Sequence, residues 1–216
     1  MFNKIWKLIE VLSQPKVFKQ LIAMNKSGYL HDIGWINSFK HHLPIDVNNN
    51  PLPWVTYSFM QFISNRLNNT MEVFEFGSGN STLWYADKVK SVISVEHDYE
   101  WFNKIKESIP LNANIIHKEL LYGGKYSNFV NSLDNKFDII IVDGRDRINC
   151  MKNSINAIKE DGIIVLDDSD RESYQEGISY LLDKNFKKID FWGIAPGIFF
   201  NKCTTIFYKN KNCIGI

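Results

Sequence analysis

The sequence has few cysteines, no long apolar run and no excess of charge of either sign. Its three cysteines, Cys150, Cys203 and Cys213, are far apart and lack the close pairs of a zinc or redox motif. We therefore expect reduced thiols in a cytoplasmic protein. The 25 Lys and Arg nearly balance the 24 Asp and Glu, so a net charge of +1 predicts no basic surface for nucleic acid.

The longest apolar runs fall far short of the roughly 20 residues that span a bilayer, so we expect no transmembrane helix. The N-terminal region also lacks the unbroken apolar stretch of a signal peptide. It carries apolar residues at helical spacing among lysines, and Pro15 separates two short predicted helices. These apolar residues are Ile5, Leu8, Ile9, Leu12, Phe18, Leu21 and Ile22. Such helices pack on their own domain, in a homodimer, or on a membrane surface as a peripheral contact.

The chain changes character near residue 70, which divides it into an N-terminal cap, residues 1–70, and a core, residues 71–216. The first part is rich in glycine, proline, asparagine and aromatic residues, which predicts a helical cap with a long loop. Its aromatic residues, including Trp35, Trp54 and Tyr57, fit either a lid over a ligand cleft or a minor hydrophobic core.

From residue 71 onward, short β-branched runs alternate with stretches of helical period, which indicates βαβ units around a parallel sheet. Expected strands cover residues 72–76, 91–96, 114–117, 137–142, 162–166, 187–192 and 204–208. Expected helices cover residues 82–88, 99–108, 126–133, 147–159 and 171–184. The last two strands are joined without a helix, so the final strand is predicted to be antiparallel. The predicted fold class is α/β: a Rossmann-like seven-stranded, mostly parallel sheet with helices on both faces and an N-terminal helical cap.

The first predicted strand of the core runs directly into a glycine-rich loop and then a helix pattern. In open α/β sheets, ligands bind beyond the carboxyl ends of the strands, where the strand order reverses. Gly77 and Gly79 let the backbone turn tightly and approach a ligand closely. Glu75 precedes them, and Glu96 ends the next strand about 20 residues later, where an acid can bind ribose hydroxyls. Thr82 stands where a dinucleotide-binding loop needs glycine or alanine, which disfavours NAD.

Four segments in order, VFEFGSGNSTLWYA, VISVEHD, FDIIIVDGRDR and GIIVLDDSD, resemble the motifs of class I S-adenosylmethionine-dependent methyltransferases over residues 71–209. The resemblance implies that the glycine loop lies under the methionine part of the cofactor, that Glu96 binds the ribose and that Glu75 helps to position the amino group. It also places the adenine pocket at Glu119 and Leu120, although Glu119 could equally be a solvated carboxylate. The expected cofactor-binding residues are Glu75, Gly77, Ser78, Gly79, Asn80, Ser81, Glu96, His97, Glu119, Leu120 and Asp143.

Two groups of carboxylates follow adjacent strands of the predicted sheet. Asp143 follows the fourth strand, and Asp167 and Asp168 follow the fifth. Adjacent strands lie roughly 4.8 Å apart, so these oxygens can converge on one cation, and Mg²⁺ is the metal that they suit. The pattern resembles catechol O-methyltransferase and its relatives, with Asp168 in place of that family's asparagine. Without a metal, the same acids would hydrogen-bond to cofactor or substrate.

Methyl transfer depends on positioning, and a hydroxyl acceptor must also lose its proton to a base or a metal. Asp143, Asp168 and His97 are the candidate catalytic groups, although His97 also suits an ordinary loop position. Arg145 and Arg147 could bind an anionic substrate or pair with nearby acids.

The sequence therefore favours a methyltransferase that acts on an oxygen, less readily a nitrogen, of a small molecule or sugar. Two alternatives remain: an aminopropyl transferase with a similar fold, and a scaffold protein without catalysis. Fold alone does not identify the acceptor.

Overall fold

The computed structural model describes residues 12–216. The first of the two predicted N-terminal helices, with Ile5, Leu8 and Ile9, lies outside the described residues. Within residues 12–71, four helices precede the sheet: α2 (Pro15–Ala23), α3 (Tyr29–Asp32), α4 (Trp35–His41) and α5 (Tyr57–Ser64). Helix α2 begins at Pro15, whose fixed φ suits the first helical position. Short helices α3 and α4 lie in the region for which a helical cap with a long loop is predicted.

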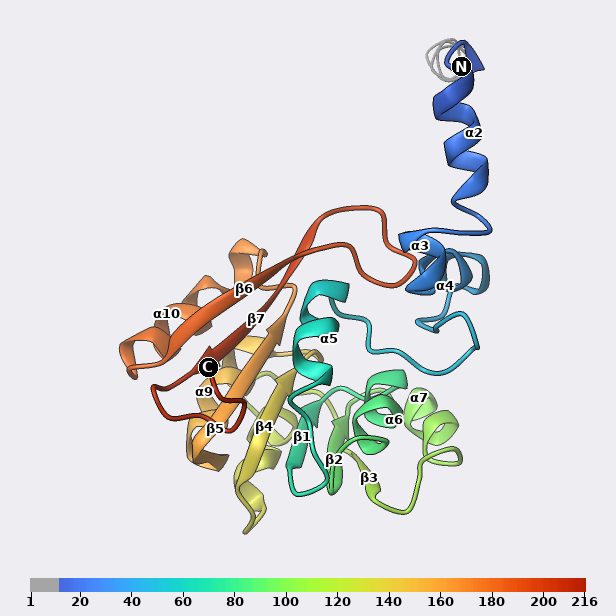
Figure 1. Ribbon diagram of the computed structural model, residues 1–216. Helices are drawn as coiled ribbons and strands as arrows, with labels where there is room; N and C mark the ends of the chain where they lie inside the picture. Colours follow the sequence, from blue (N-terminus) through green and yellow to red (C-terminus); the bar gives the residue numbers. More distant parts are fainter. Residues whose placement is uncertain (1–11) are drawn as a thin grey trace.

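A seven-stranded sheet forms the centre of the molecule (Figure 1). Its strands are β1 (Glu72–Phe76), β2 (Ser91–Glu96), β3 (Ala113–His117), β4 (Phe137–Val142), β5 (Ile158–Asp167), β6 (Lys187–Gly193) and β7 (Lys202–Tyr208). The strand order is β3-β2-β1-β4-β5-β7-β6, and β7 alone runs in the direction opposite to the other strands. The predicted fold class is confirmed. The strand order reverses at β1, which lies between β2 and β4.

The helices that follow the strands are α6 (Asn80–Ala86), α7 (Tyr99–Ile105), α8 (Lys125–Asn128), α9 (Arg147–Ala157) and α10 (Gln175–Asp183), with 3-10 turns η1 (Phe129–Ser132) and η2 (Glu172–Tyr174). Helix α6 begins two residues earlier than predicted, because Thr82 Oγ1 accepts a hydrogen bond from the backbone N–H of Gly79 (3.2 Å). Helix α9 ends earlier than predicted because Ile158 already pairs with Phe137 in the sheet.

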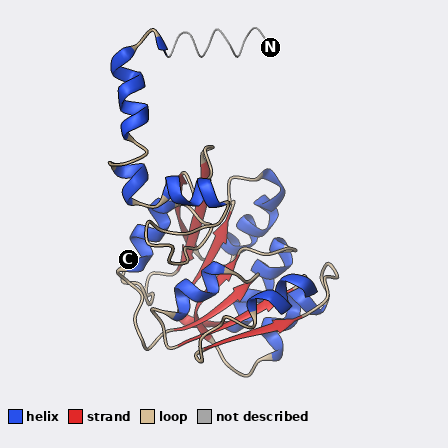
Figure 2. Ribbon diagram, turned by 90° about the vertical axis from the view of Figure 1, so that its right-hand side faces the viewer, coloured by secondary structure: helices blue, strands red, loops and turns tan. Residues whose placement is uncertain are grey.

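Alternate residues of each central strand enter opposite layers of the core. Val73, Ile139 and Ile141 pack in one layer with α5 and α6. Phe74 and Ile140 pack in the other layer with α9 and α10. Because helices cover both faces, as Figure 2 shows, these strands are continuous apolar runs without polar alternation.

The aromatic residues of the first 70 positions join the same core as the sheet. Trp35 and Val55 are buried with Val73 in the layer of α5. The indole N–H of Trp35 donates to the carbonyl of Ile198 (3.0 Å), and that of Trp54 donates to the carbonyl of Pro196 (2.8 Å), which fastens this part of the chain to the β6–β7 loop. A boundary between two units at residue 70 stays a prediction. Between residues 12 and 216, no helix has the length and apolar character needed to cross a membrane.

Candidate functional site

Four strands bring their carboxyl ends to one edge of the sheet in register. Strand β1 pairs with β2 and β4, and β4 pairs with β5. The residues that directly follow the last paired position of each strand therefore lie side by side. These residues are Gly77, Glu96, Asp143 and Asp167. The acids that are far apart in the sequence therefore gather at the point where the strand order reverses.

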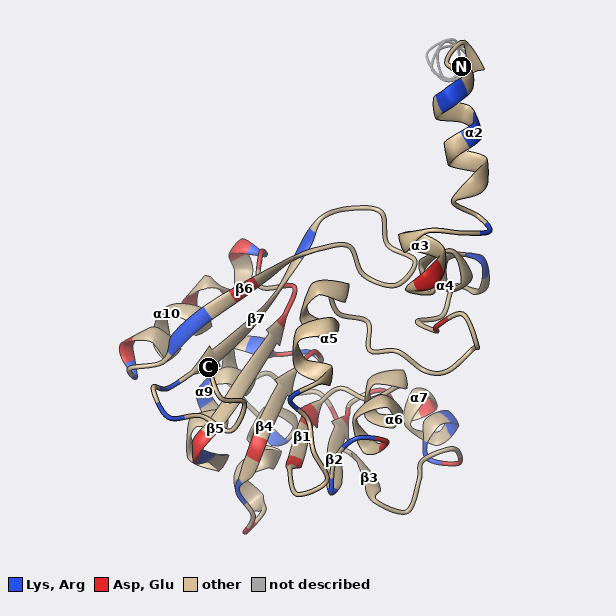
Figure 3. Ribbon diagram, in the orientation of Figure 1, with Lys and Arg blue, Asp and Glu red and all other residues tan. Residues whose placement is uncertain are grey.

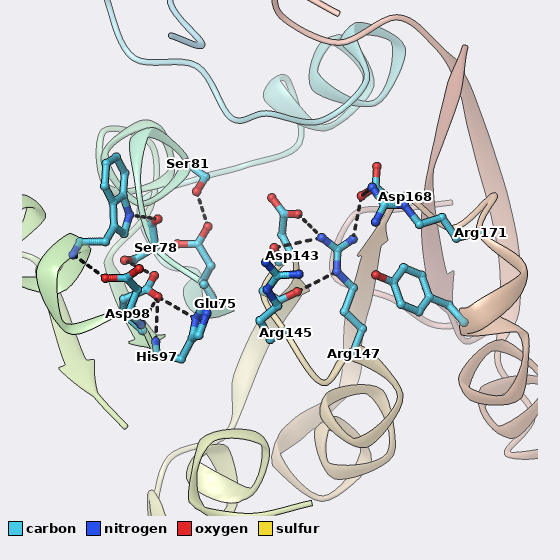
Figure 4. A pocket seen from close by; sticks show the side chains of 15 residues that line it. Glu75, Ser78, Ser81, His97, Asp98, Asp143, Arg145, Arg147, Asp168 and Arg171 are labelled. Carbon is cyan, nitrogen blue, oxygen red and sulfur yellow. Dashed lines mark hydrogen bonds and ion pairs between the residues drawn. The ribbon is translucent and has the colours of Figure 1, made fainter. Parts of the chain in front are cut away.

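A cleft of about 490 Å³ opens at this edge, within the roughly 300–1000 Å³ typical of small-molecule sites. Figure 4 shows its side chains in two groups. The group from the ends of β1 and β2 includes Glu75, Ser78, Ser81, Glu96, His97, Asp98 and Trp101. The group that follows β4 and β5 includes Asp143, Arg145, Arg147, Asp168, Arg171 and Tyr174.

Glu96 is the acid at the end of β2, and only 3% of it is exposed. Its Oε2 accepts a hydrogen bond from Ser78 Oγ (2.8 Å), and its Oε1 accepts from the backbone N–H groups of His97 (2.7 Å) and Asp98 (2.9 Å). The imidazole Nδ1 of His97 lies 2.9 Å from the same Oε1 but does not point at it as a donor. These contacts fix the carboxylate at the wall of the cleft beside the glycine loop.

Glu75 is buried beneath that loop and is held by three hydroxyl groups. Ser81 donates to its Oε1, while Thr82 (2.6 Å) and Ser94 (3.0 Å) donate to its Oε2. Burial raises the pKa of Glu75 from 4.5 to about 7, and the three hydroxyl groups oppose that rise. The side chain thus ties the start of α6 to the sheet at a point that also faces the cleft.

The glycine loop approaches the loop after β4 so closely that side chains would not fit between them. Gly77 has φ +98°, and a Cβ there would lie 3.3 Å from backbone atoms of Gly144. A Cβ on Gly144 would lie 2.0 Å from the hydroxyl of Tyr126 and 3.0 Å from the backbone N of Gly77. The floor of the cleft is therefore bare backbone, which a ligand can approach closely.

Arg147 joins the ends of β4 and β5. Its guanidinium lies 3.0 Å from Asp143 Oδ1 and 3.4 Å from Asp168 Oδ2, and it also donates to the backbone carbonyls of Gly144 (2.9 Å) and Asp167. Only 8% of the residue is exposed. Of the two roles considered for Arg147, the structure supports pairing with acids.

The two aspartates at the end of β5, Asp167 and Asp168, already have cationic partners. Lys202 Nζ lies 2.5 Å from Asp167 Oδ2 and 2.7 Å from Asp168 Oδ1. Thr204 donates to the other oxygen of Asp167 (2.7 Å), and Arg171 lies 2.6 Å from Asp168 Oδ2. Lys202, which is 4% exposed, comes from β7.

This arrangement does not support the predicted magnesium site. Donors engage both oxygens of Asp167 and of Asp168 and one oxygen of Asp143, where a metal would need them. In the described part of the chain, no group of three His, Cys, Asp or Glu side chains is placed to hold a metal ion. The magnesium prediction is not supported, because Lys202 and Arg147 supply positive charge to these acids.

The environments of Asp143 and Asp168 shift their pKa values in opposite directions. Burial, followed by the neighbouring Asp167 carboxylate, raises the pKa of Asp143 well above its usual range, although Arg147 and Lys202 oppose the rise. Burial also acts on Asp168, but Lys202, Arg147 and Arg171 outweigh it and lower the pKa of that carboxyl. Asp143 is therefore the better proton acceptor of the two, and Asp168 stays ionised.

Several predicted site residues do not line the cleft. Asp167 is buried and absent from the lining, Gly79 lies beside the ring of Trp101, and Asn80 donates to the carbonyl of Pro44 (2.8 Å). Glu119 is exposed, and Leu120 packs against the core layer of α9. The aromatic residues considered for a lid or a minor core also do not line the cleft; these are Trp35, Trp54 and Tyr57.

Sequence reasoning missed Trp101, whose indole N–H donates to the carbonyl of Ser78 (2.8 Å). A signal was present, because Asp98 follows a strand and caps α7 by accepting from the backbone N–H of Trp101 (2.9 Å). That cap places the tryptophan on the first turn, facing the glycine loop. Arg171, Tyr174 and Lys202 carried no local signal.

No protein-family profile and no curated protein matches the chain. Solved structures do match. A precorrin-6y C5,15-methyltransferase from Geobacter metallireducens GS-15 is 12% identical, with a TM-score of 0.55 over 71% of this chain and 87% of that one. A Streptococcus mutans protein assigned as a methyltransferase and solved in complex with SAH is 10% identical, with a TM-score of 0.52 over 69% of this chain and 95% of that one.

A spermidine synthase from Thermotoga maritima has the same arrangement, with 15% identity and a TM-score of 0.51 over 74% of this chain and 61% of that one. At such low identities the likeness concerns the fold. The chain has the Rossmann-like fold of class I S-adenosylmethionine-dependent methyltransferases.

The raised pKa of Glu75 predicts that this residue destabilises the protein as the pH rises. The unfolded chain ionises this carboxyl near pH 4.5 and the folded protein near pH 7, so the stability it contributes is present at low pH and is lost by about pH 8. Glu75→Gln cannot ionise, so from about pH 5 to about pH 8 it should gain roughly 2 to 3 kcal/mol relative to wild type. Urea unfolding of both proteins at the two pH values measures this gain, and parallel pH profiles would contradict it.

The cationic role of Lys202 predicts a large cost for its removal. Lys202→Met leaves two buried carboxylates without their shared cation, and we expect a loss of about 3 to 5 kcal/mol in the free energy of unfolding. Lys188→Met, which breaks a partly exposed pair with Asp190, is the matched control and should cost less than about 1 kcal/mol. Magnesium chloride should leave the unfolding midpoint of the wild-type protein unchanged. A higher midpoint in magnesium chloride would instead support the predicted metal site.

Proposed function

We propose that the protein is an S-adenosylmethionine-dependent methyltransferase that acts on an oxygen, less readily a nitrogen, of a small molecule or sugar. The observation that carries this proposal is the position of Glu96. It ends the strand next to the glycine loop, it is fixed by Ser78 and by two backbone N–H groups, and it lines the cleft. A carboxylate in that place is suited to binding ribose hydroxyls.

The residues around Glu96 fit the rest of the cofactor. Gly77 and Gly144 line the cleft with backbone alone, where the methionine chain would lie, and Ser78 and Ser81 offer hydroxyls at the same wall. Trp101 gives that wall an aromatic surface. Glu119 and Leu120 stay predicted contacts to adenine, although neither belongs to the cleft lining.

Bound S-adenosylmethionine supplies a methyl group on a positively charged sulfur. In this proposal Asp143 accepts the proton of the acceptor hydroxyl, because its carboxyl group faces the cleft and has a raised pKa. Arg147 orients Asp143 through the 3.0 Å contact. Asp168 stays ionised and binds the acceptor, and His97 is the second candidate for the base.

The acceptor is not determined by the fold. An rRNA methylase from Streptococcus thermophilus has the same fold, with 13% identity and a TM-score of 0.52 over 70% of this chain and 93% of that one. The near-neutral charge of the present chain supports a small acceptor over nucleic acid. Its three free thiols, Cys150, Cys203 and Cys213, support the expected cytoplasmic location.

An aminopropyl transferase is the second candidate, because a spermidine synthase has this fold. That reaction uses a donor without a carboxylate. In the described structure the exposed guanidinium of Arg145 lines the cleft beside Asp143 and makes no side-chain hydrogen bond or ion pair. A free guanidinium there suits the methionine carboxylate, which favours S-adenosylmethionine as the donor.

The proposal predicts that Glu96 and Asp143 affect different steps. Glu96→Gln should weaken the affinity for S-adenosylhomocysteine by about tenfold to a hundredfold, because a charged hydrogen bond to ribose is lost. Asp143→Asn should keep that affinity within about threefold and lower turnover by about a hundredfold or more. Calorimetric titration measures the affinities, and transfer of a labelled methyl group to a panel of hydroxyl acceptors measures turnover.

Equal losses of affinity in both variants would contradict this division of roles. If wild-type protein does not bind S-adenosylhomocysteine at all, the methyltransferase proposal fails and the scaffold alternative takes its place.

The role of Arg145 separates the two donors. Wild-type protein should bind S-adenosylhomocysteine at least about tenfold more tightly than its decarboxylated analogue, and Arg145→Gln should remove most of that difference. Competition calorimetry with the two ligands measures the ratio. Tighter binding of the decarboxylated ligand would support the aminopropyl transferase instead.

A further inference from the structure

Helix α2 extends from the body of the molecule and buries none of its residues (Figure 1). Its apolar side chains remain exposed: Val17, Phe18, Leu21 and Ile22. An isolated helix of nine residues is unstable in water unless its apolar face is covered. The face therefore requires an occupant.

The helix has two distinct sides. At 100° per residue, Val17, Leu21, Phe18 and Ile22 fall on one continuous arc, and Lys16, Lys19 and Gln20 fall on the opposite arc. A helix with lysines on its polar side and large apolar residues on the other is suited to the boundary between lipid headgroups and acyl chains.

A second apolar element lies at the base of α2. The β6–β7 loop exposes 69% of Phe199 and 66% of Phe200. Phe199 is anchored on α4, with ring centroids 4.5 Å from Trp35 and 4.9 Å from Phe39. The loop is thus fixed with its aromatic residues facing solvent, beside the helices that carry α2.

We propose that α2 and the β6–β7 loop form a docking surface for an anionic membrane. The charges of residues 12–31 favour an anionic lipid surface as the occupant. Residues 12–31 contain Lys16, Lys19 and Lys26 and no Asp or Glu, although acids nearly equal bases in the whole chain. Among the charged residues on α2, Figure 3 shows basic ones and no acidic ones. Lysines beside an apolar face are attracted to anionic headgroups.

A second copy of the chain is a poorer occupant. Two α2 helices packed through their apolar faces would bring four lysines into one small assembly, with no acid in residues 12–31 to pair with Lys16 or Lys19. An anionic bilayer provides both the apolar interior and the counter-charge.

The docking surface is on the same edge of the molecule as the cleft. The β6–β7 loop follows the carboxyl end of β6, which runs parallel to β1, β4 and β5. Docking would therefore turn the carboxyl edge of the sheet toward the bilayer. This inference does not depend on the proposed methyltransferase activity.

Co-sedimentation of the full chain with vesicles tests the inference. We expect binding to vesicles of equimolar phosphatidylglycerol and phosphatidylcholine, and at least about tenfold weaker binding to phosphatidylcholine alone or at high salt. Leu21→Glu should lower the partition into the anionic vesicles by about tenfold or more. Phe200→Ser should lower it by a smaller factor. Neither substitution disturbs the core, because both side chains are exposed.

Leu111→Glu is the matched control. Leu111 is fully exposed and precedes β3, so it lies at the opposite, amino edge of the sheet, and the variant should bind vesicles like wild type. The inference fails if wild type does not bind anionic vesicles, or if Leu21→Glu and Leu111→Glu bind equally well. It also fails if light scattering shows a wild-type dimer that Leu21→Glu converts to a monomer without any vesicle binding, since the occupant would then be a second copy.

Discussion

The placement of several carboxylates at one edge of the sheet is the constraint on which the site depends. Charges removed from water are costly unless each has a partner, and like charges side by side add to the cost. Each acid here has its own compensation: hydroxyl groups for Glu75, backbone N–H groups for Glu96, Arg147 for Asp143, and Lys202 for Asp167 and Asp168. The charges of these five acids are therefore compensated by protein groups, and the cleft needs no metal ion to balance them.

These different partners divide the cleft into two functional halves. On the side of β1 and β2, Ser78 and two backbone N–H groups hold the Glu96 carboxylate in place, which suits the binding role proposed for it. On the side of β4 and β5, Arg147 bridges Asp143 and Asp168, whose pKa values are shifted in opposite directions, which suits the proton transfer proposed for Asp143. The parallel register places the two halves next to each other, so a ligand bound by the first half is presented to the second.

Much of this could be predicted from the sequence, because it is encoded locally. The strands appear as apolar runs, the glycine loop follows one of them directly, and Glu96 ends the next. The partner of Asp167 could not be predicted, since Lys202 is 35 residues away and reaches it only when β7 pairs antiparallel with β5. For that reason the sequence suggested a magnesium site that the structure does not support. Of the two roles considered for the aromatic residues of the N-terminal cap, a lid or a hydrophobic core, the structure supports the core for Trp35, which is buried in the layer of α5.

The central claim is that the edge formed by Gly77, Glu96 and Asp143 is a binding site for the adenosyl cofactor. A crystal structure of the protein with S-adenosylhomocysteine tests it most directly. The account predicts ribose hydroxyls within hydrogen-bond distance of the Glu96 carboxylate, with the methionine chain across Gly77 and the sulfur facing Asp143. Ligand density at another place, with Glu96 still bonded only to Ser78 and the backbone, would contradict it.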